Sequence, residues 1–361
     1  MRSALSDNSI IELNHINDEN RTRRFSIKKV LGSGASCIAY EAIDIDNSIS
    51  IIIKECFPHC AVARKENGTI IWKSPNDEVN AKERFIDTCE KQRQIQTSEG
   101  TRHTSTHMID GLHNGNNTLY SISGMHCIET YDTRKDLTLQ DIFITARAVA
   151  RAVNRYHERG WLYLDIKPQN ILMDPDTLDK IWLLDFDSII KITDVKNYNV
   201  TISYTHGYAA PELLQGKSSK ICEATDIYSI GAMMFNRIMN RVPTASDICT
   251  FSDWDFTEID MFNRLSSKTL RLTKELLRKA LSVSIHNRFQ NSIELISALD
   301  ELINESAPNK IFLKNSCPTP VNYFVGRYDE LNQIQSAFKS GKKVVFLHGM
   351  GGCGKTEVAL N

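Results

Sequence analysis

The stretch Tyr163-Leu-Asp-Ile-Lys-Pro-Gln-Asn170 decides how the rest of the chain is interpreted. Within eight residues it places a carboxylate (Asp165), a base (Lys167) and an amide (Asn170), and a second carboxylate, Asp185, follows a later apolar strand. This spacing suits one phosphoryl-transfer site, in which Asp165 accepts the proton of a substrate hydroxyl and Lys167 neutralises the transferred phosphate. Asn170 and Asp185 would hold Mg²⁺. The alternative is a loop of solvated charges, which a D-x-K-P-x-N pattern disfavours.

Two features nearer the N-terminus fit the same site. Gly32 and Gly34 end one predicted strand, and a glycine-rich hairpin lets backbone N–H groups approach phosphate oxygens. Alone, this hairpin would equally fit an ordinary tight turn. Lys54 ends the apolar run SISIIIK, and a lysine at the end of a buried strand needs an anion. An ATP phosphate is one candidate for that anion, and a surface position for Lys54 is the other reading.

The hydrophobic pattern predicts an α+β chain with two lobes. Residues 25–120 contain mainly strand-like segments with one charged helical stretch at 76–96. From Leu139 the apolar residues fall at helical spacing, until Gly160 ends the pattern. We therefore expect a β-rich lobe at about 25–127 and a helical lobe at about 128–304. Residues 1–24 are polar and predict a tail or an edge strand.

The order of these motifs along residues 25–304 resembles that of a eukaryotic-type Ser/Thr protein kinase domain. The segments KECFP, WLYLDIKPQNIL and LLDFDS resemble the bacterial branch of that family. The resemblance extends to Ala210-Pro-Glu212, the helix start at Asp226, and Arg288, which in such kinases pairs with the glutamate of Ala-Pro-Glu. It implies the bilobal protein kinase fold, with ATP between the lobes and the γ-phosphate passing to a protein substrate. Lys167 and Thr205 match the Ser/Thr pattern rather than the Tyr pattern.

The resemblance also assigns roles to single residues. It implies that Gly32, Gly34 and Lys54 bind the nucleotide, and that Lys54, Asp165 and Lys167 take part in catalysis. A helix glutamate should hold Lys54. The likeness of CEKQRQI to the family's helix favours Glu90, while Glu83, seven residues earlier on nearly the same face, is the alternative.

Three departures from the family pattern bear on function. Tyr163-Leu164 stands in place of His-Arg, so a phosphorylated activation loop lacks its usual partner. Asp187 replaces the glycine of Asp-Phe-Gly, and Cys37 takes the third glycine position of the hairpin. These substitutions leave a second reading open, namely a pseudokinase that binds nucleotide and acts as a signalling scaffold.

A new unit is expected after a linker at 305–320, which holds three prolines. Residues 349–356 form a complete G-x-x-x-x-G-K-T behind the strand VVFL, which predicts that Gly354, Lys355 and Thr356 bind a nucleotide phosphate. Together with Phe324-Val-Gly-Arg327, this motif resembles the opening of an NB-ARC-like (STAND) signalling ATPase. The sequence given ends five residues after Thr356, so we expect 321–361 to be the incomplete start of such a domain, without ATPase turnover of its own.

Composition excludes several other classes of protein. The chain has 43 Lys+Arg, 44 Asp+Glu and a net charge of −1, so general nucleic-acid binding is not expected. No stretch approaches the ~20 apolar residues of a membrane span, and the N-terminus has no apolar signal region. Nine cysteines are too dilute for a disulfide scaffold, and Cys56 and Cys60 lack a second metal-binding pair. We expect a cytoplasmic protein with reduced thiols; the oligomeric state is not indicated.

Overall fold

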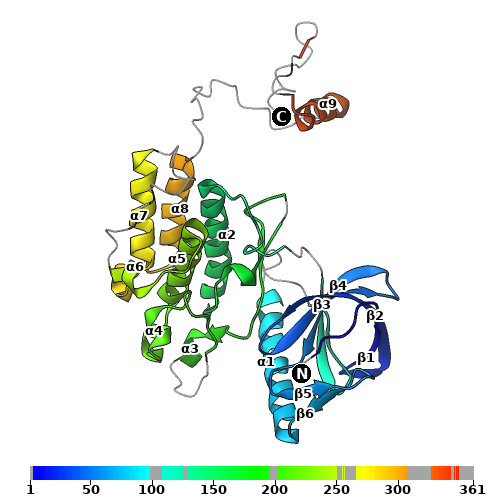
Figure 1. The fold of residues 1–361 in the computed structure, drawn as a ribbon. Coiled ribbons are helices and arrows are strands. Elements are labelled where there is room, and N and C mark those ends of the chain that lie inside the picture. The colour runs from blue at the N-terminus through cyan, green and yellow to red at the C-terminus, as the bar shows by residue number, and fades with distance from the viewer. Residues whose placement is uncertain are drawn as a thin grey trace. The chain divides into compact units, whose positions relative to one another are not determined.

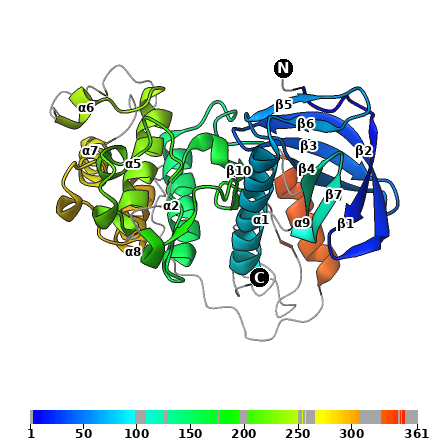
Figure 2. The ribbon, with the colours of Figure 1, turned by 90° about the horizontal axis from the view of Figure 1, so that it is seen from below.

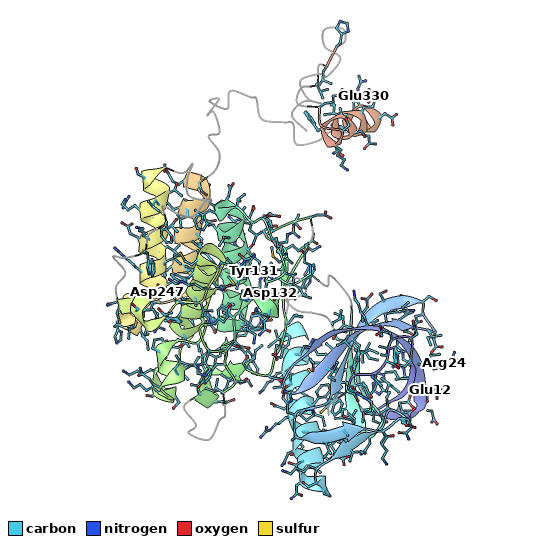
Figure 3. All side chains as sticks on the ribbon, viewed as in Figure 1. Glu12, Arg24, Tyr131, Asp132, Asp247 and Glu330 are labelled. Atoms are coloured by element: carbon cyan, nitrogen blue, oxygen red, sulfur yellow. The ribbon has the colours of Figure 1, made fainter. Side chains whose placement is uncertain are left out.

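The computed structural model describes residues 3–97, 108–124, 129–174, 176–195, 202–249, 254, 256, 266–306, 327–342, 345, 347 and 348. The chain divides into two compact units, Met1–Ser306 and Ala307–Asn361. In the second unit the described helix is α9 (Tyr328–Lys339), which carries Glu330 (Figure 3). The predicted phosphate loop, with Gly354, Lys355 and Thr356, lies outside the described residues, as does the predicted boundary between the lobes near 127–128.

The first part of the larger unit is a closed antiparallel barrel (Figure 1). Its strands follow the order β1-β2-β3-β4-β8-β7. They are β1 (Ile10–His15), β2 (Asp18–Ser33), β3 (Cys37–Asp44), β4 (Ile49–Cys56), β7 (Met108–Gly115) and β8 (Thr118–Gly124). Every second residue of β3 is buried, as expected for a strand with one face toward a core. Phe25, Ile27, Tyr40, Ile53 and Tyr120 are fully buried in this core.

The N-terminal residues form strands, which corrects the prediction of a tail over 1–24. Ile11 and Leu13 are buried while their neighbour Glu12 is exposed, so β1 has the period of two that a strand needs. Glu12 lies opposite Arg24 of β2 (Figure 3). The other side of β1 pairs with β7, so this strand closes the barrel and is not an edge.

Helix α1 (Pro75–Thr97) packs on the outer surface of the barrel (Figure 2). Its Phe85 and Cys89 contribute to an apolar cluster with Cys56 of β4 and Leu119 of β8. The side chain of Ser74 accepts a hydrogen bond of 3.2 Å from the backbone N–H of Asp77 at the start of the helix. A hairpin of β5 (Ala61–Arg64) and β6 (Ile70–Trp72) precedes α1.

The remainder of the larger unit is mainly helical. The long helices are α2 (Leu139–His157), α5 (Glu223–Met239), α7 (Ser267–Ala280) and α8 (Ser292–Ser306). The short helices are α3 (Ile192–Val195), α4 (Pro211–Leu214) and α6 (Ala245–Cys249). Short strands, β9 (Trp161–Leu162), β10 (Ile171–Met173), β11 (Ile181–Leu183) and β12 (Ile190–Lys191), form two antiparallel pairs that carry the loops of the candidate site.

Helices α2 and α5 supply the centre of the helical core, as the apolar spacing after Leu139 predicts. Thr138 and Asp141 form a capping box at the start of α2. On α5, a Cβ added to Gly231 would approach the Cβ of Ala280 on α7 to 2.7 Å, so glycine permits this close packing. Among the described residues, no helix is both long and apolar enough to span a membrane.

Candidate active site

The loop between β9 and β10 gathers the first predicted group around Asp165. The ammonium of Lys167 donates to one carboxylate oxygen of Asp165 at 2.7 Å, and the amide of Asn170 donates to the same oxygen at 3.1 Å. Thr205 donates to the other oxygen at 2.6 Å and accepts from Lys167 at 2.7 Å. These four residues form one hydrogen-bonded set, and only 6% of Asp165 is exposed.

A buried aspartate at the start of α5 holds this loop in place. The carboxylate of Asp226 accepts the backbone N–H groups of Tyr163 at 2.9 Å and Leu164 at 2.7 Å, and its other contact is the ring of His157 at 2.8 Å. Leu164 has a left-handed φ of 63°, a conformation that costs a residue with a Cβ roughly 1–2 kcal/mol. Because Asp226 is fully buried, its two hydrogen bonds stabilise the strained turn just before Asp165.

The second predicted carboxylate, Asp185, follows β11 and lies near Lys54. Burial raises the pKa of Asp185, and the charge of Asp187 raises it further, while Lys54 acts in the opposite direction. Burial opposes the charge of Lys54, but Cys37, Asp185 and Asp187 outweigh it and raise the pKa of Lys54. The structure therefore brings the strand lysine of the barrel to the carboxylates of the helical part.

The residues Asn170 and Asp185 have the chemistry of a divalent-cation site. The amide nitrogen of Asn170 is used by Asp165, and within the described residues its amide oxygen accepts no hydrogen bond. A buried carboxylate with a raised pKa gains from a nearby cation, and hard oxygen ligands suit Mg²⁺. No group of three or more His, Cys, Asp or Glu that could hold a metal occurs in the part of the chain that the structure describes. Ligands from a bound nucleotide would complete the site.

The glycine hairpin lies between β2 and β3. The backbone N–H of Gly34 donates to the carbonyl of Cys37 at 2.9 Å, which closes the turn. A Cβ built on Gly32 would meet no atom within 4 Å, and one on Gly34 would meet only this carbonyl, at 3.8 Å. Packing within the described residues therefore does not require glycine here. Open space above a backbone turn is what a phosphate group needs.

A buried ion pair joins α4 to the segment before α8. Arg288 donates to both carboxylate oxygens of Glu212, at 2.7 and 2.8 Å, and to the carbonyl of Ala224 at 3.1 Å. Both charged side chains are almost completely enclosed. This is the pairing that the resemblance implies for the glutamate of Ala-Pro-Glu.

Residues 25–293 match the family model described as "Protein kinase domain". The chain belongs to the protein kinase family. Over 119 residues it is 34% identical to maternal embryonic leucine zipper kinase of Xenopus laevis, and over 138 residues it is 31% identical to protein kinase C zeta type of Oryctolagus cuniculus. These matches cover 32% and 38% of this chain. The chain spans only about a fifth of the curated relatives, 18% and 22% of their lengths.

A solved structure supports the kinase fold. PpkA-294 in its apo form has a TM-score of 0.55 with this chain at 21% identity, covering 77% of this chain and 95% of that one. At that identity the likeness concerns the fold alone.

Within the part of the chain that the structure describes, Lys54 is not paired with either predicted glutamate. Glu83 and Glu90 are exposed on α1, and within the described residues no ion pair joins Lys54 to either. Among the described residues of α1, it is Cys89 and not a glutamate that lies close enough to Lys54 to influence its pKa. Because one residue turns a helix by about 100°, Glu90 points away from the face that Cys89 presents to the barrel. Glu90 instead lines a cavity of about 300 Å³ together with Trp161 of β9 and Lys191 of β12.

The departure at Asp187 has a structural role that the sequence does not reveal. The hydroxyl of Thr88 on α1 donates to the carboxylate of Asp187 at 3.0 Å, and the backbone N–H of Asp187 donates to Asp185 at 3.2 Å. Asp187 thus links α1 to the loop that carries Asp185. Thr88 was not among the predicted residues, and no motif marks it.

The departure at Leu164 lies in an apolar cluster. Leu164 packs with residues of the segment that follows Asp187, and partly buried Ile202 and Tyr204 cover the cluster. Besides Leu164, the buried members of this cluster are Leu162, Ile190, Val195, Ala209, Leu213 and Ile221. In this kinase, apolar contacts occupy the position where the family pattern has an arginine that binds a phosphate.

Proposed function

We propose that this kinase transfers the γ-phosphate of ATP to Ser or Thr hydroxyls of a protein substrate in an Mg²⁺-dependent reaction. The observation that carries the proposal is the hydrogen-bonded set of Asp165, Lys167, Asn170 and Thr205. The Ser/Thr preference rests on Lys167 and Thr205, which contact each other and Asp165. Kinases are among the relatives that the chain matches by sequence, and each match covers only part of the relative's length.

Each residue has a separate task in this reaction. Asp165 orients the incoming hydroxyl and accepts its proton, while Lys167 lies where it neutralises charge on the transferred group. Lys54 and the backbone at Gly32 and Gly34 bind the phosphates. Asn170 and Asp185 would hold Mg²⁺, which would supply charge neutralisation for the phosphates. Thr205 fixes the positions of Asp165 and Lys167 through its two hydrogen bonds.

The direct test is transfer of radiolabelled phosphate from ATP to a mixed library of Ser/Thr peptides, with Asp185→Ala as the inactive comparison. A scaffold that binds nucleotide without catalysis is the second candidate, because Lys54 has no glutamate partner on α1 within the described residues. Binding of Mg-ATP by the unmodified chain without labelling of any peptide or of the chain itself would favour that scaffold.

Activity should not depend on a phosphate in the activation segment. Leu164 carries no charge to bind one, and it already packs with Ile190, Val195 and Ala209. We expect phosphatase-treated protein to keep its full initial rate in the peptide assay, with dephosphorylation verified by mass spectrometry. A large loss of rate that preincubation with ATP restores would show that another basic residue replaces the arginine.

We also propose that the kinase is coupled to a STAND-type ATPase that begins near residue 321. This rests on the G-x-x-x-x-G-K-T motif at 349–356 and its resemblance to NB-ARC proteins. A signalling role would follow from such a pairing of an ATP-driven sensor with a kinase.

The phosphate loop should not contribute to ATP consumption by the 361-residue chain itself. All contacts that build the proposed site come from the unit Met1–Ser306. We therefore expect Lys355→Ala to leave both phosphate release from ATP and peptide labelling unchanged, whereas Lys54→Ala abolishes labelling. If Lys355→Ala removed most of the ATP consumption, the second phosphate loop would be an active site in its own right.

A further inference from the structure

Three cysteines from three elements meet beside the proposed phosphate site. Cys37 begins β3 directly after the glycine hairpin, Cys56 ends β4, and Cys89 lies on α1. All three belong to one cluster with Phe85 and Leu119, and none of them forms a disulfide in the structure. The proposed transfer reaction uses none of these thiols.

Cys37 and Cys56 are direct cross-strand partners in the antiparallel pair β3–β4. In the adjacent pair, the backbone N–H of Phe57 donates to the carbonyl of Ser36 at 3.2 Å, so Cys37 and Cys56 occupy a non-hydrogen-bonded position. Their side chains therefore point to the same face, with Cα atoms roughly 4.5 Å apart. This lies within the ~4.4–6.8 Å that a disulfide requires. The strand spacing at this pair is therefore compatible with a disulfide between the two thiols.

The two thiols differ in their reactivity. Burial raises the pKa of Cys56 to about 12 and that of Cys89 to about 11, so both stay protonated near neutral pH. Cys37 is only partly buried, and it lies close enough to the Lys54 ammonium for the two groups to interact electrostatically. A thiolate is the reactive form of cysteine, and a nearby cation favours it. Cys37 is thus the thiol suited to attack an oxidant, and Cys56 is placed to react with it next because it is the direct cross-strand partner.

We propose that Cys37 is a peroxide-sensitive modification site that Cys56 resolves as an intramolecular disulfide. The Cys37 thiolate attacks one oxygen of a hydroperoxide; an S–O bond forms, the O–O bond breaks, and the peroxide leaves as water or an alcohol after protonation. The sulfur of Cys37 is thereby oxidised to a sulfenic acid. The sulfur of Cys56 then attacks it, an S–S bond forms, and the sulfenic oxygen leaves as water with the proton of Cys56.

The expected consequence is loss of kinase activity, and this part rests on the proposed function. Ala39 follows Cys37 on the same face of β3 and lies opposite Lys54, so the new bond would form two residues from the phosphate-binding lysine. It would also fix the strand that leaves the glycine hairpin. Because a misplacement of 1 Å can cost ~10²-fold in rate, we expect a loss of at least about tenfold that a thiol reductant reverses.

Peptide mapping tests the site itself without reference to activity. Trypsin should release Cys37 in peptide 30–54, Cys56 together with Cys60 in 55–64, and Cys89 in 85–91. The full chain is therefore treated with hydrogen peroxide in a Cys60→Ser background and digested without reductant. The expected product joins 30–54 to 55–64, which in that background is a Cys37–Cys56 bond. A bond from 30–54 to 85–91 instead would overturn the assignment of Cys56.

Two further variants complete the test. In Cys56→Ala, dimedone should trap a sulfenic acid at Cys37. For activity, each variant is compared with its own untreated rate: Cys60→Ser should stay sensitive to peroxide, and Cys37→Ser should become resistant. Cys37 that remains unmodified while exposed Cys60 and Cys249 oxidise would refute the proposal. A chain that shows the mapped disulfide but no transferase activity before treatment would refute only the proposed function.

Discussion

Asp165→Asn is expected to lower the rate of phosphate transfer by roughly 10²–10⁴ while leaving the affinity for Mg-ATP nearly unchanged. The amide cannot accept the substrate proton, yet it has the size of the carboxylate and can still accept from Lys167 and Asn170. The effect should therefore fall on kcat. Initial rates with a Ser/Thr peptide and a separate titration of Mg-ATP by calorimetry measure the two quantities.

Two further variants serve as comparisons in this experiment. Asp179→Asn makes the same chemical change at an exposed position outside the hydrogen-bonded set and should leave both quantities unchanged. Asp185→Asn should weaken Mg-ATP binding as well, because it removes a buried charge near the proposed metal site. Equal rates for Asp165→Asn and the unmodified chain, in a preparation that phosphorylates peptides, would exclude Asp165 as the proton acceptor.

The proximity of Asp165, Lys167 and Asn170 could be predicted from the sequence because the chain between Tyr163 and Asn170 is short. A loop of this length keeps Asp165, Lys167 and Asn170 close together, whatever surrounds it. The position of Asp185 could be predicted with one further inference, namely that the strand before it pairs next to this loop. The structure has that pairing, because β11 is antiparallel to β10. The match to the protein kinase family agrees with this part of the interpretation.

The face of α1 could not be predicted in the same way. The helix is charged around most of its circumference, so no apolar stripe shows which side meets the barrel. If Glu90 rather than Cys89 is chosen as the residue that faces the barrel, the predicted orientation of the helix about its own axis changes by about 100°. The hydrogen bond from Thr88 to Asp187 joins residues 99 positions apart, and β1 pairs with β7 across a similar separation. No local pattern encodes such contacts.

The largest expected effect on stability comes from Arg288→Met. The guanidinium is buried and donates to both oxygens of Glu212, and its removal leaves a buried carboxylate without its cation. Such a loss costs about 3–5 kcal/mol, a large part of the ~5–15 kcal/mol that holds a folded protein together. Urea unfolding followed by the fluorescence of Trp161, Trp182 and Trp254, all buried in the helical part, measures the free energy of unfolding.

Two matched variants separate the buried pair from charge removal in general. Arg271→Met breaks the exposed pair of Arg271 with Glu275 on α7, which lies at a comparable distance of 2.9 Å, and should cost no more than about 1 kcal/mol. The double variant Glu212→Gln/Arg288→Met should recover part of the loss, because the side chain left behind is then neutral and the uncompensated charge is gone. If Arg288→Met were no more destabilising than Arg271→Met, the ion pair would not be what holds the start of α4 to the loop before α8. In that case the contacts of Arg288 with the carbonyls of Ser282 and Ala224 would also have to be replaceable at little cost.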